Sequence, residues 1–393
     1  VRTMSTTVDT LAPLHADMTA WRRDIHAHPE TAFEETRTAQ LVAERLASFG
    51  VDVHRGLAKT GVVGTLRAGT GERAIGLRAD LDALHIHEQN EFAHRSRHPG
   101  RMHACGHDGH TTMLLGAARY LAETRRFDGT VYFIFQPAEE NEGGGRAMVE
   151  EGLFDRFPMA GVYGLHNWPG LPAGTFGVLP GPMMASSDVF EIAVTGRGAH
   201  GAMPHTGVDP VVAASALVQA LQTIPSRTLD PIEPAVVTVT QFHAGDAWNV
   251  IPEQAILRGT TRAFRPTVQD QIEAGIRRVC AGIDATHGTR SSVRYERRYP
   301  PTINHPRETG IAVAAMAAVV GAQNVRTDLP PTMGAEDFAF MLQAKAGCYA
   351  FLGSGGSEAG CILHNPRYDF NDDILPIGAS YWATLVEQVL API

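Results

Sequence analysis

Short apolar runs alternate with helix-like stretches through the first half of the chain, and this alternation restricts the fold more than any other feature of the sequence. Strands are expected where β-branched and aromatic residues gather, at residues 61–67, 74–79, 130–136 and 162–165. Helices are expected at residues 11–28, 35–49, 111–123 and 144–151. Strands that alternate with helices predict an α/β sheet with helices on both faces.

A second pattern begins near residue 184. Strand, helix, strand, strand, helix and strand are expected in turn, at residues 188–195, 209–223, 235–242, 255–262, 268–286 and 291–297. This is the order of a ferredoxin-like module. Because 393 residues exceed what one core usually holds, we predict two domains, one of residues 1–183 and 301–393 and an inserted one of residues 184–300. A glycine- and serine-rich stretch at residues 353–357 predicts a mobile loop.

Composition excludes several classes of protein. The net charge of −9 argues against nonspecific binding to nucleic acid. No stretch is apolar for long enough to span a bilayer, so no membrane is expected, and residues 1–10 lack the apolar core of a secretory signal. Free thiols in a reducing cytoplasm are predicted for the widely spaced cysteines Cys105, Cys280, Cys348 and Cys361.

Residues 102–110, with the sequence Met-His-Ala-Cys-Gly-His-Asp-Gly-His, place a thiol and three imidazoles close together. Thiolates and imidazoles bind borderline metal ions such as zinc. Cys105 and His107 can point to one side of a turning chain, and the glycine between them permits tight geometry. The alternative is a polar loop with incidental histidines, since the chain has 18 of them. We favour a metal site, with His103 and His110 behind the ligands or at a helix terminus.

Two adjacent carboxylates, Glu139 and Glu140, follow the strand expected at residues 130–136. Neighbouring carboxylates repel each other unless cations offset the repulsion. One could bind a metal ion while the other acts as a general base on an activated water. The alternative is an exposed acidic turn, which Glu142 would also suit. The apolar strand in front of the pair favours the metal site.

Weaker candidates for the metal site are the single histidines His166 and His364 and the aspartates Asp80 and Asp82. A lone histidine is more often structural than a ligand, and an aspartate after a strand often only forms a turn. Their placement raises their weight, because Asp80, the glutamate pair and His166 each follow a predicted strand, where open α/β sheets bind ligands. The aspartates could also orient a ligating imidazole through its second nitrogen.

Three donors stand out in the inserted module: His200, Asn249 and Arg262. They could hold an oxyanion or the carboxylate of a substrate. From spacing alone, a structural role is the simpler interpretation for all three.

Several motifs, in order along nearly the whole chain, resemble the dinuclear metal amidohydrolases related to aminoacylase and carboxypeptidase, in the branch of hippurate hydrolases and plant auxin-conjugate hydrolases. The motifs are residues 21–30, 78–84, 102–110, 136–140, 164–169, 196–205, 249–252, 333–338 and 363–371. The resemblance implies a zinc-peptidase-like α/β catalytic domain with an inserted ferredoxin-like α+β lid. It also implies a homodimer formed through the lid, or a tetramer.

The resemblance further implies two divalent metal ions per chain, with zinc, manganese, cobalt and nickel all open. The matching ligand positions are Cys105, His107, Glu140, His166 and His364. Related peptidases carry a histidine where this chain has Arg78 and an aspartate near Cys105. The chain therefore resembles the branch that uses a thiolate.

Catalytic and substrate-binding roles are implied in the same way. Glu139 matches the general base and Asp80 the supporting acid. His200 resembles a lid histidine that reaches the active site of a partner subunit. Asn249 resembles a lid donor near the scissile carbonyl. The residues that lie where a substrate carboxylate is gripped are Arg262 and the loop at Gly334.

These features predict an enzyme that hydrolyses the amide bond of N-acyl amino acids, either hippurate-like or N-acetylated. One alternative is a metallo-carboxypeptidase or dipeptidase that cleaves short peptides, because both substrates offer an amide beside a carboxylate. Another is a noncatalytic metal- or ligand-binding protein on the same scaffold. Glu139 beside Glu140 weighs against the last alternative, since a binding protein needs no base.

Overall fold

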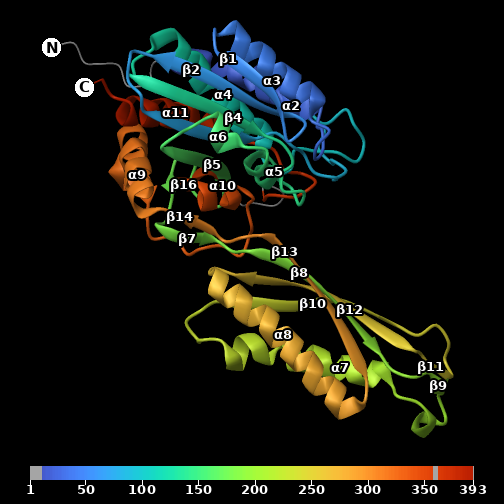
Figure 1. Cartoon of the computed structure of the whole chain (residues 1–393). Coiled ribbons are helices and arrows are strands. Elements are labelled where there is room, and N and C mark those ends of the chain that lie inside the picture. Colours follow the sequence, from blue (N-terminus) through green and yellow to red (C-terminus); the bar gives the residue numbers. More distant parts are fainter. Residues whose placement is uncertain (1–10, 357–361, 393) are drawn as a thin grey trace. The chain divides into compact units, whose positions relative to one another are not determined.

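The chain folds into two units, each with its own sheet (Figure 1). The computed structural model describes residues 11–356 and 362–392. The first unit comprises Val1–Met183, Ile303–Pro330 and Asp337–Ile393, and the second comprises Met184–Thr302 and Pro331–Glu336.

The sheet of the first unit mixes parallel and antiparallel strands. Their spatial order is β1 (Asp52–Leu57), β2 (Gly61–Ala68), β4 (Gly129–Gln136), β3 (Ala74–Asp80), β5 (Gly161–Pro169), β16 (Gly347–Gly355), β6 (Phe176–Gly177) and β15 (Val325–Arg326). β3 runs parallel to β4 and β5, and β16 runs parallel to β5. The carboxyl ends of these central strands therefore meet at one edge of the sheet, where ligand sites form in such folds.

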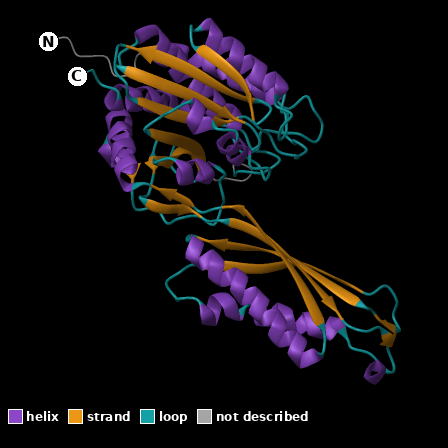
Figure 2. Ribbon diagram, in the orientation of Figure 1, coloured by secondary structure: helices purple, strands orange, loops and turns teal. Residues whose placement is uncertain are grey.

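Helices surround this sheet (Figure 2). They are α2 (His15–Ala27), α3 (Thr36–Ser48), α4 (His107–Thr124), α5 (Gly144–Glu150), α6 (Leu153–Arg156), α9 (Pro306–Val320), α10 (Phe338–Ala344) and α11 (Leu375–Val389). Helix α4 packs on β3 and β5 and also contacts α2, α3 and α11, whereas α5 and α10 pack on each other. Every residue of β3 is buried, as expected of a central strand covered on both faces.

Three of the boundaries that differ from the sequence-based expectation affect residues or loops singled out above. Helix α4 begins at His107 rather than near residue 111, so His107 and His110 lie in its first turn. Strand β5 continues to Pro169, so His166 lies within the strand rather than after it. The loop expected at residues 353–357 is wrong in its first part, because β16 extends to Gly355. Residue 357 lies outside the described residues.

The second unit is a ferredoxin-like module. Its sheet has the spatial order β10 (Ala235–Ala244), β12 (Gln254–Ala263), β8 (Ser187–Thr195) and β13 (Arg290–Tyr299). Helices α7 (Pro210–Leu221) and α8 (Pro266–His287) pack on each other and on this sheet, and the inward residues Phe190, Ile192 and Val194 of β8 join their core. Alternation of buried and half-buried residues along β8 is the pattern of a sheet covered on one face. The predicted fold class is confirmed.

Short elements complete the two units. The short strands β9 (Ala199–His200) and β11 (Val250–Ile251) pair with each other, as do β7 (Gly181–Met184) and β14 (Thr302–Asn304). Short helical turns lie at Ala12–Leu14, Pro204–Thr206, Ile224–Thr228, Ala322–Asn324 and Asp372–Ile374.

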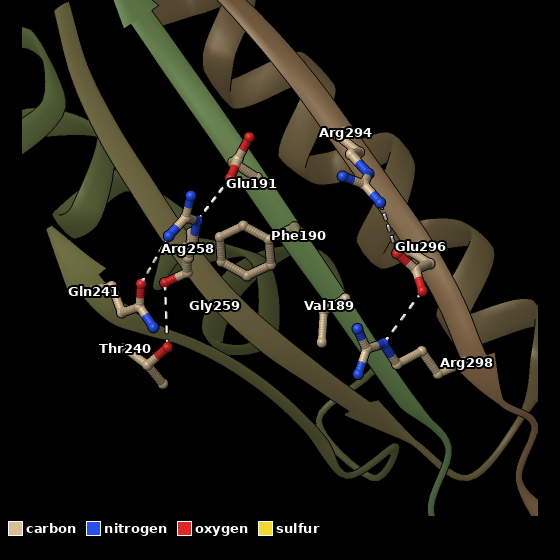
Figure 3. Close-up of a pocket in the computed structure, with 10 residues that line it drawn as sticks. All are labelled: Val189, Phe190, Glu191, Thr240, Gln241, Arg258, Gly259, Arg294, Glu296 and Arg298. Carbon is tan, nitrogen blue, oxygen red and sulfur yellow. Dashed lines mark hydrogen bonds and ion pairs between the residues drawn. The ribbon is translucent and has the colours of Figure 1, made fainter. Parts of the chain in front are cut away.

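The other face of the second sheet carries charged side chains around a hollow of about 300 Å³ (Figure 3). Arg258 Nε lies 2.6 Å from Glu191 on the neighbouring strand. On β13, the carboxylate of Glu296 forms ion pairs with Arg294 at 3.2 Å and Arg298 at 3.3 Å. Paired charges of this kind are typical of a solvated sheet face, and exposed pairs add little stability.

The expectations about membrane-spanning segments and about free cysteines can be compared with the described residues. Within them, no helix combines the length and the apolar character that a bilayer crossing requires. Cys105, Cys280 and Cys348 are buried thiols outside any disulfide. Cys361 lies outside the described residues.

Candidate active site

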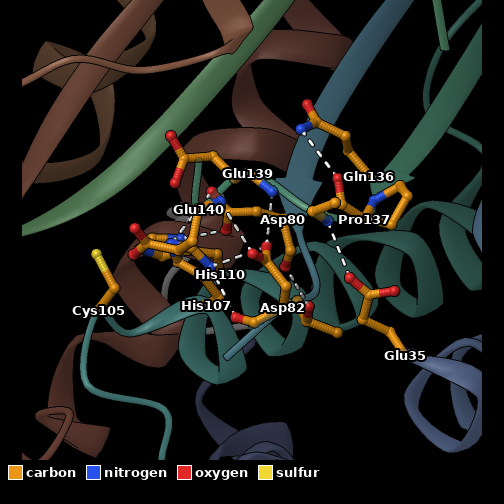
Figure 4. Close-up of polar contacts among 12 residues, drawn as sticks. Glu35, Asp80, Asp82, Cys105, His107, His110, Gln136, Pro137, Glu139 and Glu140 are labelled. Carbon is orange, nitrogen blue, oxygen red and sulfur yellow. Dashed lines mark hydrogen bonds and ion pairs between the residues drawn. The ribbon is translucent and has the colours of Figure 1, made fainter. Parts of the chain in front are cut away.

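The ends of strands and the start of one helix bring several predicted site residues together, and Figure 4 shows Asp80, Cys105, His107, Glu139 and Glu140 side by side. Asp80 ends β3, β4 ends just before the turn that carries Glu139, and His107 begins α4. Gly106, which precedes the helix, has φ of +95°, and a Cβ atom there would lie 2.1 Å from Asn167 Oδ1. Only glycine therefore fits between Cys105 and His107 without displacing Asn167.

Two overlapping groups of donor atoms form the centre of the site. The candidate ligand atoms of Cys105, His107 and His166 lie within 4.8 Å of one another, and so do those of Cys105, Glu140 and His364. Cys105 Sγ lies 3.4 Å from His166 Nε2, and His364 Nε2 lies 3.1 Å from Glu140 Oε1. His107 also groups with the Glu139–Glu140 pair. Because these groups share members, the donors form one continuous set.

The donor set fits divalent cations. His107 Nε2 is buried and makes no hydrogen bond with any described residue. Glu140 Oε1 is buried as well, and its near neighbour, His364 Nε2, is itself a candidate ligand. The Nδ1 atoms of His107 and His166 point away from the donor set. His107 Nδ1 donates to the main-chain oxygen of Asp82 at 2.9 Å, and His166 Nδ1 donates to that of Asn167 at 2.6 Å. Such outward hydrogen bonds leave each Nε2 lone pair for a metal ion, and thiolate, imidazole and carboxylate together suit zinc-like ions.

The electrostatics of the site favour the same interpretation. Burial raises the pKa of the Cys105 thiol, so a neighbouring cation is needed to favour the thiolate. Burial lowers the pKa of His166 well below its usual value, which keeps this imidazole in the neutral form that binds metals. Burial alone would raise the pKa of Asp80, but two neighbouring histidines and Arg78 hold it well below its usual range.

A buried arginine network, which the sequence analysis did not identify, lies behind the donor set. The side chain of Arg78 is 1% exposed and lies 2.8 Å from Asp80 Oδ2 and 3.0 Å from Asp337 Oδ1. Its Nε also donates to Gln136 Oε1 at 2.8 Å. Asp80 Oδ1 in turn contacts His110 Nδ1 at 2.6 Å. Asp80 is therefore fixed from both sides, and only its place after a strand could have suggested a buried role.

Asp82 connects the donor set to the glutamate pair. Its Oδ1 accepts the main-chain N–H of Glu139 at 3.0 Å, and its Oδ2 accepts that of Glu140 at 2.9 Å. Glu139 is 6% exposed, and one of its carboxylate oxygens accepts the main-chain N–H of Asp337 at 3.4 Å. The two glutamates thus project from a turn whose backbone is held by buried groups, rather than from an exposed acidic loop.

The remaining predicted residues lie in the second unit, in two separate places. His200 pairs with Val250 where β9 meets β11, and the main-chain oxygen of Asn249 accepts the N–H of Gly201 beside it at 2.7 Å. Arg262 lies near the far end of β12, where Ser186 donates to the oxygen of Ala263. Gly334 lies there too, because its oxygen accepts the N–H of Ala185.

These two places lie at opposite ends of the sheet of the second unit. The β9–β11 pair joins the start of β12 at Gln254, and Arg262 is next to its end. At about 3.3 Å per residue, the strand between them spans roughly 25 Å. His200 and Asn249 therefore do not share a site with Arg262 and Gly334 within the second unit of one chain.

Comparisons with known proteins agree with the motifs. Residues 76–388 match the model of peptidase family M20/M25/M40. The chain is 42% identical to the hippurate hydrolase of Campylobacter jejuni, over 94% of this chain and 95% of that protein. It is 38% identical to the IAA-amino acid hydrolase ILR1-like 4 of Arabidopsis thaliana, over 95% of this chain and 86% of that protein.

A solved structure shows the same likeness in three dimensions. The YXEP protein of Bacillus subtilis, described as a dinuclear metal binding peptidase, superposes with a TM-score of 0.86 at 34% identity, covering 97% of this chain and 99% of that chain. The family predicted from the motifs is confirmed. The chain belongs to peptidase family M20/M25/M40.

Proposed function

We propose that this protein is a metal-dependent amidohydrolase that cleaves N-acyl amino acids into a carboxylic acid and a free amino acid. The observation that carries the proposal is the position of Glu139, whose carboxylate lies within 4.8 Å of donor atoms of His107 and Glu140. A second carboxylate at the rim of a donor set is what a hydrolase needs for proton transfer. The hippurate and IAA-amino acid hydrolases among its relatives support this substrate class.

Two divalent ions are part of the proposal, held by Cys105, His107, Glu140, His166 and His364. The grouping of these donors and the dinuclear relative from Bacillus subtilis support it. Bound ions of this kind supply Lewis acidity and lower the pKa of water towards about 7.

In the proposed mechanism, Glu139 accepts the proton of the attacking water and returns it to the leaving amine. Its main-chain N–H donates to Asp82 and its carboxylate accepts the N–H of Asp337, and these two buried bonds keep the carboxylate at the rim of the donor set. Asp80 is the supporting acidic residue, because its contacts with Arg78 and His110 keep its carboxylate charged and fixed, with Oδ2 3.7 Å from His107 Nε2. Asp82 orients His107 through its main-chain oxygen.

The second unit supplies substrate contacts in this proposal, as a lid on the catalytic unit. Arg262 and the Gly334 loop bind the substrate carboxylate, and the half-buried guanidinium is suited to a carboxylate partner. His200 and Asn249 donate to the developing oxyanion. Since these pairs occupy opposite ends of β12, one active site can use both only if they come from two chains. We therefore propose a homodimer formed through the lid.

A cytoplasmic location also belongs to the proposal. It is supported by the buried thiols of Cys105, Cys280 and Cys348, which form no disulfide among the described residues.

A substrate and metal screen tests the function. Purified protein is stripped with a chelator, reloaded separately with zinc, manganese, cobalt or nickel, and assayed on N-benzoyl, N-acetyl and indoleacetyl amino acids and on dipeptides. Hydrolysis of the N-acyl amino acids that disappears on stripping and returns with metal is expected. Faster cleavage of dipeptides would favour a peptidase, and metal binding without any hydrolysis would favour a binding protein.

A further inference from the structure

The turn that carries Glu139 and Glu140 has an unfavourable backbone conformation. Ala138, before the pair, has φ of +54°, and Asn141, after it, has φ of +69°. Asparagine tolerates this left-handed region, but alanine disfavours it, so the conformation of Ala138 persists only where the surrounding structure holds it. The direction of both carboxylates depends on these two residues.

Three consecutive backbone N–H groups of this turn each meet a buried carboxylate oxygen (Figure 4). Glu35 Oε1 accepts the N–H of Ala138 at 2.9 Å, and the two oxygens of Asp82 accept those of Glu139 and Glu140. Asp82 follows β3, whereas Glu35 precedes α3. The turn is therefore held from two different elements.

The carboxylate of Glu35 is fully enclosed and acts only as an acceptor. The residue is 0% exposed, and its other partners are the N–H of Phe33 at 3.0 Å and the hydroxyl of Thr60 at 2.6 Å. Burial raises the pKa of Glu35 to about 7, although the Thr60 hydroxyl opposes that shift. Burying a carboxylate costs free energy, and Glu35 is buried where it bonds the segments of Phe33, Thr60 and Ala138.

The helix that Glu35 precedes does not use it. Glu35 occupies the N-cap position of α3 and makes no side-chain capping bond there. Glu30 satisfies the start of the helix instead, because its carboxylate accepts the N–H groups of Arg37 at 2.9 Å and Thr38 at 2.8 Å. Removal of Glu35 therefore leaves the capping of α3 intact, and its bond to Ala138 serves the turn.

We propose that Glu35 is a positioning residue that holds Ala138 in its left-handed conformation and so directs Glu139 and Glu140 towards the donor set. This inference rests on the proposed function for its kinetic consequence. Its structural consequence, a fixed turn, is independent of any substrate.

The test compares Glu35→Ala, Glu35→Asp, Glu35→Gln and the control Glu151→Ala in the full-length protein. Glu151 is a matched control because its carboxylate also accepts the N–H of a left-handed alanine, Ala58 (φ +48°), at 2.7 Å. Three quantities are measured: kcat and KM on hippurate, zinc affinity by competition with a chelating dye, and amide hydrogen exchange of a peptide covering residues 137–143.

Glu35→Ala is expected to lower kcat roughly 10²-fold with little change in KM, because small misplacements of catalytic groups have effects of this size. Zinc affinity falls, and the 137–143 peptide exchanges faster in the absence of substrate. The shorter side chain of Glu35→Asp cannot reach the N–H of Ala138, so this variant is expected to show the same changes in kcat, zinc affinity and exchange. It replaces Glu35→Ala as the test if that variant does not fold. Glu35→Gln can still accept from Ala138 and stays within about threefold of wild type. Glu151→Ala changes none of these quantities.

Wild-type kcat and wild-type exchange at residues 137–143 in folded Glu35→Ala or Glu35→Asp would overturn the inference. A loss of kcat in both without faster exchange would also contradict it, since the turn would then not have moved. If the unaltered protein hydrolyses no substrate, the proposed function fails, but zinc affinity and exchange still decide the role of Glu35.

Discussion

At the scale of single residues, Arg78 and Cys105 decide which side chains of the candidate site can bind a metal ion. A guanidinium cannot act as a metal ligand, because it stays protonated. Arg78 instead pairs with Asp80 and Asp337, both of which are 0% exposed. The proposed ligand set instead depends on Cys105. This residue belongs both to the donor group of His166 and to the donor group of His364.

The first prediction concerns Glu139. Glu139→Gln keeps the size of the side chain and removes its basicity, so it is expected to bind metal normally and to lose roughly 10²- to 10⁴-fold in kcat. Metal content by elemental analysis and single-turnover rates on hippurate measure the two effects. Turnover close to that of the unaltered protein would remove Glu139 from the role of general base.

A second prediction concerns stability. Arg78→Met leaves Asp80 and Asp337 buried without their cation, which costs about 3–5 kcal/mol in the free energy of unfolding. Urea unfolding of the metal-loaded protein measures this loss. The control is Arg326→Met, which breaks the exposed ion pair with Asp328 at 2.8 Å and is expected to leave the free energy unchanged. Equal effects of the two substitutions would show that the buried network is not stabilising.

At the scale of elements, the sequence predicts those strands and helices that have a local pattern. The β-branched and aromatic run at residues 130–136 is β4, and the ferredoxin-like order follows from periodicity alone. The early start of α4 could not be predicted, because it depends on the left-handed conformation of Gly106 against Asn167. Likewise, β5 continues through polar residues because His166 and Asn167 are satisfied inside the site.

Local sequence patterns also could not predict the contacts that hold the candidate site in place. Arg78 bonds Asp337, 259 positions away, and Glu35 bonds Ala138, 103 positions away. Cys105, His107 and the Glu139–Glu140 pair could be singled out because their residue types are unusual at those spacings, whereas His166 and His364 were proposed as ligands from their placement and from the resemblance. Their supporting residues are common types whose role appears only when the strand ends meet.

The third prediction tests the start of α4. Gly106→Ala would place a Cβ atom 2.1 Å from Asn167 Oδ1 and 2.9 Å from the Tyr368 hydroxyl, so the segment between Cys105 and His107 must shift. Lower zinc occupancy and lower stability are expected. Gly50→Ala is the control, since its φ of +77° is similar but nothing lies within 4 Å of the added atom. It should cost only about 1–2 kcal/mol and keep full zinc occupancy. Equal zinc occupancy in both variants would contradict the steric argument.

At the scale of the whole molecule, the two units divide the proposed work. The first unit contains the donor set and the proposed base, and the second contains the proposed substrate contacts at the two ends of one sheet. An enzyme in which each chain completes the active site of its partner would explain why the proposed substrate contacts lie at both ends of β12. Such an exchange is reciprocal in a symmetric dimer.

The last prediction uses this reciprocity. Glu139→Gln chains lack the base but keep His200, and His200→Ala chains lack the lid donor but keep Glu139, so each form alone is expected to be nearly inactive. After equal amounts are mixed and subunits exchange, half of the dimers are mixed and each contains one complete site, so roughly a quarter of the wild-type activity should return. The assay is hippurate hydrolysis over time, with native mass spectrometry to follow the mixed dimers. Mixed dimers without recovered activity would show that His200 serves its own chain, and wild-type activity of the His200→Ala chains before mixing would show that it has no catalytic role.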